Sequence, residues 1–178
     1  MSYLVRAFVP GDRTALQAHL ARHRGESGRG DPHFMPFTPI ELQRPREFDM
    51  DATTKALTEV GWQRWFVAIA VSGEIVGNLD LKGDGLETSL HRCELGIGIE
   101  RPHRRAGLGR QLMEAAIGFA KQADTLAWLD LHVFGHNAPA IALYRSLGFA
   151  EIGQIEDRFR VEGQSIDDLL MTLRIAPE

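Results

Sequence analysis

The chain has 178 residues, of which 44% are hydrophobic, 8% aromatic and 25% charged. These shares are close to those of average soluble globular domains, so we expect one domain over residues 1–178. The net charge of -4 argues against general nucleic-acid binding, which needs a basic footprint. No apolar run approaches the ~20 residues of a membrane span, and the single Cys93 excludes an internal disulfide framework. We therefore expect a cytoplasmic protein without nucleic-acid or membrane partners.

The first part of the chain predicts two helices around a long loop. Residues 3–8 have the pattern of a strand, and a helical pattern follows from 14 to about 23. Residues 25–48 contain too many glycines and prolines for a long regular element, yet they include apolar side chains. We expect a loop that either covers the core or acts as a lid over a pocket. A helix is expected from 51 to about 60.

The rest of the chain alternates between strand and helix patterns. Ser72-Gly73 separates two apolar runs and predicts a hairpin. The expected strands are 65–71, 74–81, 91–99, 126–134 and 166–175, and the expected helices are 108 to about 122 and 137 to about 147. Hairpins followed by strand, helix, strand, helix and strand predict an α+β fold with a mixed sheet.

The segment 99–110 joins the end of a strand to the start of a helix through a basic, glycine-containing loop. Unpaired N–H groups at a helix N-terminus attract anions, and glycines let a phosphate approach the backbone. The alternative is a solvated basic turn. Two common nucleotide motifs do not fit, because no Gly-Lys-Ser/Thr follows the loop and Arg101 stands where the pattern starting at Gly96-Ile-Gly98 needs a third Gly.

Two motifs resemble those of the Gcn5-related N-acetyltransferase (GNAT) family. Arg104-Arg-Ala-Gly107-Leu-Gly109 is similar to the acyl-CoA loop of that family. The second motif follows about thirty residues later and consists of Asn137, Ala140, Tyr144, Gly148 and Phe149. The resemblance is clear over about residues 74–174 and implies a mostly antiparallel central sheet flanked by helices. Residues 153–171 are also similar to the end of spermidine and ribosomal-protein acetyltransferases of the family.

The resemblance implies acetyl-CoA as the cosubstrate. His33 and His103 have no metal-ligand spacing with the other histidines or with acids, so we expect no metal. The strand from Ile97 to Ile99 would present backbone groups to the pantetheine arm, and the following loop would hold the pyrophosphate. Glycines 96 and 98 suggest a bulge or a close backbone approach, which favours the ligand over ordinary sheet pairing. The implied cofactor-binding residues are Ile97, Gly98, Ile99, Arg104, Arg105, Ala106, Gly107, Leu108, Gly109, Arg110 and Asn137. Asn137 also fits the N-cap of a helix.

The family resemblance also implies the catalytic groups. Tyr144 matches the general acid that protonates the leaving thiolate, although a buried core tyrosine is the alternative. His132 aligns with a strand position where some relatives carry a catalytic Glu, and a neutral imidazole can accept a proton. Glu94 is the rival base, and deprotonation through water also stays open. Cys93 next to Glu94 is expected to be structural.

We therefore expect an N-acetyltransferase in which a primary amine, preferably of a small molecule, attacks acetyl-CoA directly in a ternary complex. The acceptor would lie near His33, Phe34, Met35 and Phe37 of the long loop, and the acidic residues nearby in sequence are Glu41, Glu47, Asp49 and Asp51. A protein N-terminus or lysine is the alternative acceptor and would need an open groove. A noncatalytic acyl-CoA sensor is the alternative of another class, and a homodimer is an option that the sequence leaves open.

Overall fold

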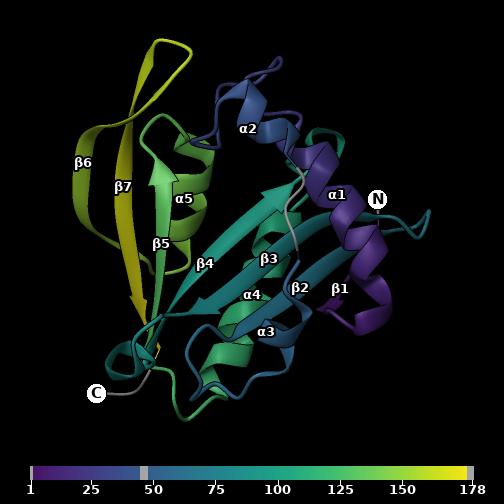
Figure 1. The fold of residues 1–178 in the computed structure, drawn as a ribbon, viewed down its shortest axis with the longest axis vertical. Coiled ribbons are helices and arrows are strands. Elements are labelled where there is room, and N and C mark those ends of the chain that lie inside the picture. Colours follow the sequence, from purple (N-terminus) through teal and green to yellow (C-terminus); the bar gives the residue numbers. More distant parts are fainter. Residues whose placement is uncertain (1, 45–47, 176–178) are drawn as a thin grey trace.

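A computed structural model describes residues 2–44 and 48–175 of the chain, and within them seven strands form one sheet in the order β1-β2-β3-β4-β5-β7-β6 (Figure 1). The pairs are antiparallel except for β4 and β5, which are parallel. The strands are β1 Tyr3–Ala7, β2 Gln63–Ala70, β3 Ile75–Gly83, β4 Arg92–Ile99, β5 Trp128–Phe134, β6 Ala150–Val161 and β7 Gln164–Arg174. The α-helices are α1 Arg13–Arg24, α2 Pro39–Gln43, α3 Met50–Thr54, α4 Leu108–Lys121 and α5 Ala138–Ser146. The predicted α+β class with a mixed, mostly antiparallel sheet is confirmed.

The helices cover the two faces of the sheet unequally. The amphipathic helix α4 buries Leu108, Leu112 and Met113 against the central strands, and α5 adds Ile141 and Tyr144 to the same main core. On the opposite face α1 buries Leu16 in a smaller cluster with Val67 and Ile75 of the sheet. The hydrophobic effect thus fixes α4 and α5 on one face of the sheet and α1 on the other (Figure 1).

The predicted helix over 51–60 is wrong beyond its first turn, because α3 ends at Thr54. The Thr53 and Thr54 hydroxyls donate to the backbone carbonyls of Met50 and Asp51, which competes with helix propagation. The Arg64 guanidinium then donates to the carbonyls of Thr53 and Lys55, and these bonds hold the chain in its turn towards β2.

Two elements were not predicted. The loop over 25–48 contains the short helix α2, which begins with a capping box: the Glu41 N–H donates to Thr38 Oγ1, and the Glu41 carboxylate accepts from the Thr38 N–H. Strand β6 was missed because most of it is exposed at the edge of the sheet and its charged residues break the apolar pattern.

Candidate active site

The sheet opens between its two parallel strands. Pairing of β4 with β5 stops at Glu94 opposite Asp130, although both strands continue. The Glu100 N–H donates to Val76 on β3, so the alternation of the antiparallel ladder turns the even-numbered residues of β4 towards β3. The odd-numbered residues therefore direct their N–H and C=O groups into the gap towards β5, and they are Leu95, Ile97 and Ile99. The structure thus places two of the predicted pantetheine residues at an unpaired strand edge.

The predicted anion loop leads from β4 into α4 with two residues in the left-handed region. Arg105 has φ 62° and Gly107, the N-cap residue of α4, has φ 77°. Alternating left-handed residues turn successive N–H groups to one side, as in anion-binding nests. A Cβ at Gly107 would meet no atom within 4 Å, whereas one at Gly109 would lie 3.1 Å from Leu143. Gly107 is therefore required by backbone conformation and Gly109 by the close approach of α4 to α5.

The three arginines of this loop that are expected to bind the cofactor point in different directions. Arg104 turns away from the loop: it donates to the Ile99 carbonyl and forms ion pairs with Glu26 and Asp31. Arg110 donates to Ser146 on α5. Arg105 is exposed and, within the described part of the chain, makes no ion pair or hydrogen bond. Its guanidinium is the one free to meet an anion here.

The predicted acid and the second motif lie on the other side of the opening, on α5. Tyr144 is 5% exposed, and burial raises the pKa of its phenol to about 12, so the group keeps its proton at neutral pH. Asn137 caps α5 by accepting from the Ala140 N–H at 3.3 Å, which confirms the N-cap reading. The side-chain NH₂ of Asn137 has no partner among the residues that the structure describes.

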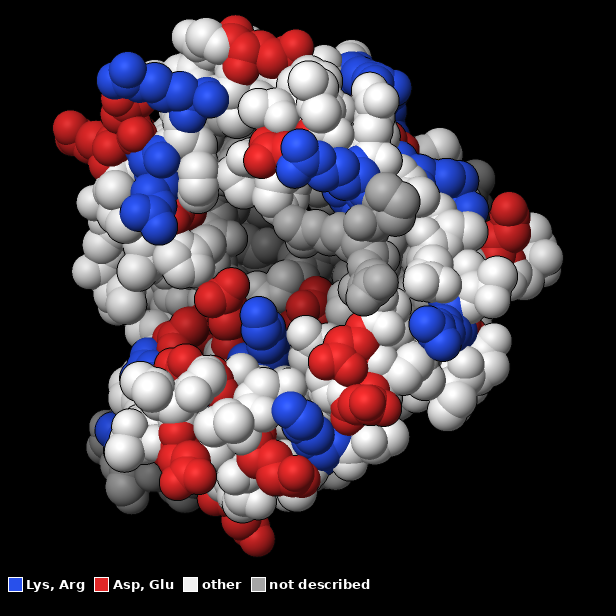
Figure 2. All heavy atoms as spheres, in the orientation of Figure 1, with Lys and Arg blue, Asp and Glu red and all other residues white. Residues whose placement is uncertain are grey.

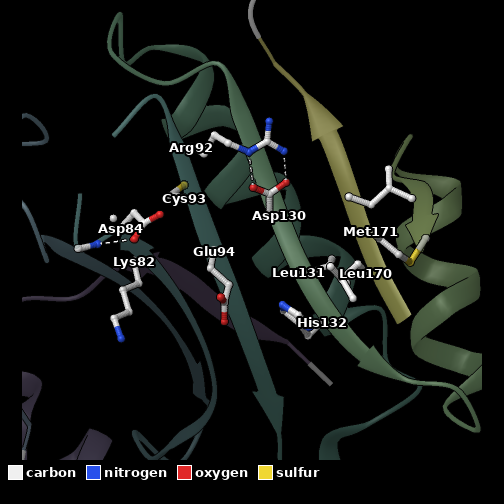
Figure 3. A pocket seen from close by; sticks show the side chains of 13 residues that line it. Lys82, Asp84, Arg92, Cys93, Glu94, Asp130, Leu131, His132, Leu170 and Met171 are labelled. Carbon is white, nitrogen blue, oxygen red and sulfur yellow. Dashed lines mark hydrogen bonds and ion pairs between the residues drawn. The ribbon is translucent and has the colours of Figure 1, made fainter. Parts of the chain in front are cut away.

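A cavity of about 500 Å³ lies on the face that carries α1, next to the opening (Figure 3). Glu94 and His132 come from neighbouring strands and both line it. His132 Nδ1 lies 2.7 Å from a carboxylate oxygen of the buried Asp168. Arg92 and Asp130 form a bidentate pair deeper in the sheet, so their charges offset each other. The structure thus brings together both candidate bases from the sequence, and it adds Asp168.

A second acidic group near the opening was missed in the sequence. Asp80 on β3 lies opposite Gly96, and a Cβ at Gly96 would be 3.1 Å from an Asp80 carboxylate oxygen. Burial, with a further contribution from the negative charge of Glu94, raises the pKa of Asp80 to about 7. No local signal marks Asp80, because single aspartates in strands are common and its place opposite Gly96 becomes visible only in the structure. Cys93 is buried, which raises the pKa of its thiol to about 12, and this fits the expected structural role.

Residues 25–38, here named the strap, span the end of the sheet where β4 and β5 diverge. On the β4 side, Glu26 accepts from the Arg101 N–H and Arg104. On the β5 side, His136 Nε2–H donates to the His33 carbonyl at 2.7 Å. His33 Nε2 also lies 3.2 Å from Glu162 in the β6–β7 turn. Figure 2 shows a hollow on this face with acidic side chains along its lower margin.

The predicted acceptor residues of the long loop are divided by the structure. Phe34 stacks on His23 with ring centroids 4.8 Å apart and lies in the strap near the opening. Glu41 instead caps α2, where the Thr38 N–H lowers the pKa of its carboxyl, and Asp49 caps α3. Of the predicted acidic residues, Glu41 and Asp49 are therefore helix caps, Asp51 lies in the first turn of α3, and Glu47 lies outside the described residues.

Two further absences hold for residues 2–44 and 48–175. No group of three or more His, Cys, Asp or Glu side chains could hold a metal ion there. No helix in this part of the chain is long and apolar enough to cross a membrane.

Comparisons with known proteins agree with this geometry. Streptothricin acetyltransferase of Streptomyces lavendulae is 32% identical over 115 residues, which is 65% of this chain and 59% of that protein. The catalytic subunit of the N-terminal acetyltransferase A complex of Arabidopsis thaliana is 29% identical over 113 residues, 63% of this chain and 58% of that protein. The ribosomal protein bS18-alanine N-acetyltransferase of Escherichia coli is 35% identical over 81 residues, 45% of this chain and 53% of that protein. The matched region thus spans between half and two thirds of these relatives.

Solved structures share the whole fold. A GNAT-family acetyltransferase from Streptococcus pneumoniae superposes with a TM-score of 0.81 at 27% identity, covering 98% of this chain and all of that one. A structure from Salmonella typhimurium, described with its cofactor acetyl-CoA, gives 0.80 at 17% identity and covers 100% of this chain and 96% of that one. Residues 33–149 match the model of the GNAT acetyltransferase family. The opening between the parallel strands β4 and β5 and the left-handed turn before α4 are consistent with this match. The chain belongs to the GNAT acetyltransferase family.

Proposed function

We propose that the protein is an acetyl-CoA-dependent N-acetyltransferase that acts on a primary amine of a small molecule. One observation carries the proposal: β4 and β5 part after Glu94 and Asp130, and the unpaired edge of β4 leads directly into the left-handed turn before α4. An extended arm with amide groups can pair with such an edge, and its pyrophosphate can then meet the N-terminus of α4.

The residues present fit acetyl-CoA. The backbone groups of Ile97 and the N–H of Ile99 would pair with the pantetheine arm, whereas the Ile99 carbonyl already accepts from Arg104. The backbone from Arg105 to Gly109 would hold the pyrophosphate, with the Arg105 guanidinium as a further donor. The Asn137 side-chain NH₂ would donate to the arm from α5. When bound, acetyl-CoA supplies a thioester whose carbonyl carbon is open to attack by an amine.

Two sets of side chains would move protons at opposite ends of the reacting group. His132 and Glu94 line the cavity from which the amine would enter, and either can accept the proton of the attacking nitrogen. We favour His132, because its Nδ1 lies 2.7 Å from the buried Asp168 carboxylate. Tyr144 lies on the α5 side of the opening and keeps its proton, so it would donate that proton to the leaving sulfur.

The strap supports a small acceptor over a protein. It joins the ends of the two strands at the mouth of the opening through Glu26 on one side and His33 on the other. A polypeptide chain would need an open groove across this mouth. A small amine needs only the cavity of about 500 Å³, whose wall is charged near Glu94 and apolar near Leu170.

Protein N-termini are the second candidate, because two of the similar proteins are named as N-terminal or ribosomal-protein acetyltransferases. A panel of small amines and of peptides with free N-termini separates the two, with release of CoA thiol measured by DTNB and acetyl-CoA binding measured by calorimetry. Turnover on small amines with little on peptides is the expected result. Binding of acetyl-CoA without turnover on any acceptor would instead indicate the noncatalytic sensor, and no binding would contradict the proposal.

A further inference from the structure

Asp168 on β7 is a direct neighbour of His132 on the adjacent strand β5. In the register of β5 with β7, His132 lies opposite Leu170 and Asp168 lies opposite Phe134, which makes Asp168 the diagonal neighbour of His132 on one face. Asp168 is 2% exposed, whereas the His132 side chain is 44% exposed. The carboxylate therefore holds the inner nitrogen of the ring, at 2.7 Å, and the rest of the ring reaches the cavity.

The Asp168 carboxylate lies in apolar surroundings, with His132 as its hydrogen-bond partner. The buried cluster at this end of β7 is apolar and consists of Phe134, Val161 and Ile166, with Phe159 packed against it. Within residues 2–44 and 48–175, the imidazole of His132 is the only side chain that bonds to the carboxylate. A buried carboxylate is strongly disfavoured unless it accepts hydrogen bonds. Asp168 thus requires a proton on His132 Nδ1 in either charge state of the ring.

We propose that Asp168 is a positioning residue that holds neutral His132 in the Nδ1–H tautomer, so that Nε2 is free to accept a proton from the acceptor amine. A neutral imidazole has one donor and one acceptor nitrogen, and the bond at one nitrogen decides the role of the other. The inference rests on the proposed acetyltransfer and on His132 as its base. It adds a reason why a histidine can serve at this position.

Groups described above account for every proton and bond in the proposed acetyl transfer. The amine nitrogen bonds to the acetyl carbon as the carbon–sulfur bond breaks. The proton of the nitrogen passes to Nε2, and the Tyr144 proton passes to the sulfur. Solvent then takes one proton from His132 and returns one to Tyr144, which restores both groups.

The other charged side chains that line the cavity form no hydrogen bond to His132 Nδ1 in the described structure. The charged residues that line it are Lys82, Asp84, Arg92, Glu94 and Asp130. Asp130 is bonded to Arg92, and Asp84 accepts from Ser89. Glu94 and Lys82 remain as the groups whose charge can change the pH dependence of His132, so both stay unchanged in the variants below.

The test compares Asp168→Asn, His132→Gln and the double variant in the full chain. A carboxamide can donate as well as accept, so Asp168→Asn no longer forces the tautomer while keeping the side-chain volume. Long-range ¹H–¹⁵N spectra of the histidine rings report the tautomer without any need for activity. Asp167→Asn is the matched control, because its carboxylate lies one residue away and bonds to Gln154 instead. It should leave both the His132 tautomer and turnover unchanged.

We expect wild-type His132 in the Nδ1–H form and a mixed or Nε2–H form in Asp168→Asn. kcat/KM should fall at least about tenfold in Asp168→Asn and by about 10²–10⁴ in His132→Gln, with acetyl-CoA affinity unchanged. The double variant should be no slower than His132→Gln, since Asp168 acts through the ring. A wild-type Nε2–H tautomer, or losses that multiply in the double variant, would overturn the proposal. An inactive wild type that binds no acetyl-CoA would instead refute the proposed function.

Discussion

Burial raises the pKa of one side chain on each side of the opening, Tyr144 on α5 and Asp80 on β3. Burial of Tyr144 raises its pKa to about 12, which keeps a donor available throughout the neutral range. Burial of Asp80 raises its pKa to about 7, so this carboxyl titrates where most proteins are studied. Desolvation disfavours the charged form in both cases. The functional consequence differs, because only the phenol lies on the helix that faces the leaving group.

Replacing Tyr144 with Phe removes the proton donor and keeps the ring in the core. The rate of the chemical step should fall by about 10²–10⁴, with acetyl-CoA affinity within about twofold of wild type. Single-turnover rates and calorimetry measure the two effects separately. Tyr3→Phe is the matched control, since Tyr3 is the other tyrosine of the chain and bonds to His103, which is not among the predicted site residues. An unchanged chemical step in Tyr144→Phe would remove the proposed role.

The choice between the two bases is tested by pH profiles of His132→Gln and Glu94→Gln on one amine of known pKa. Wild-type turnover should rise with pH as the base loses its proton, and the acid limb should disappear in His132→Gln only. Both profiles are taken at saturating acetyl-CoA after folding is verified. Loss of the limb in Glu94→Gln alone transfers the role to Glu94. No change in either variant indicates deprotonation through water.

Titration of Asp80 should lower the free energy of unfolding as pH rises. Its pKa is about 7 in the fold against an ordinary value of 3.8, so the fold prefers the protonated form and loses this contribution as pH rises towards 7. Asp80→Asn stays neutral and removes the loss. Between pH 5 and pH 8, the free energy of unfolding of the variant should gain about 2–3 kcal/mol relative to wild type. A difference that is equal at both pH values in urea titrations would show that Asp80 does not titrate in this way.

At the scale of the elements, the turn from β4 into α4 depends on a glycine at position 107. Gly107 has φ 77°, which costs other residues roughly 1–2 kcal/mol, and most for β-branched ones. Gly107→Val should keep the fold, because a Cβ there meets nothing within 4 Å, but the altered turn should abolish acetyl-CoA binding. Gly118→Val is the matched control, since Gly118 lies within α4 and its Cβ also meets nothing. Wild-type affinity of Gly107→Val in calorimetry would contradict the assignment of the loop.

Local patterns predict the elements around this turn, and long-range contacts decide the rest. The apolar spacing of α4 and the glycine after α5 mark both helices to within a residue or two, because these signals are local. Strand β6 pairs with β7 and is exposed over most of its length, so most of its sequence shows no apolar face. Arg104 could not be placed, since its partners Glu26 and Asp31 lie more than seventy residues away. Asp168 reaches His132 through strand register alone.

At the scale of the whole molecule, the two halves of the sheet meet through a short contact and are joined again by the strap. The direct pairing of β4 with β5 covers the three residues from Arg92 to Glu94. Beyond it, the strap ties the end of β4 to the β5–α5 connection and to the β6–β7 turn. The opening is therefore closed at both ends, and a cosubstrate from the α4 side and an amine from the cavity side can meet within it.

The proposed function requires that acetyl-CoA binds in this opening. The most direct measurement is a titration of the ¹⁵N-labelled chain with acetyl-CoA, followed through the backbone amide resonances. Saturable shifts should be largest for residues 95–99 of β4 and 105–109 of the turn, with little change in β1 or in the β6–β7 turn. Absence of shifts at millimolar acetyl-CoA, or saturable shifts elsewhere while both segments stay unchanged, would contradict the claim.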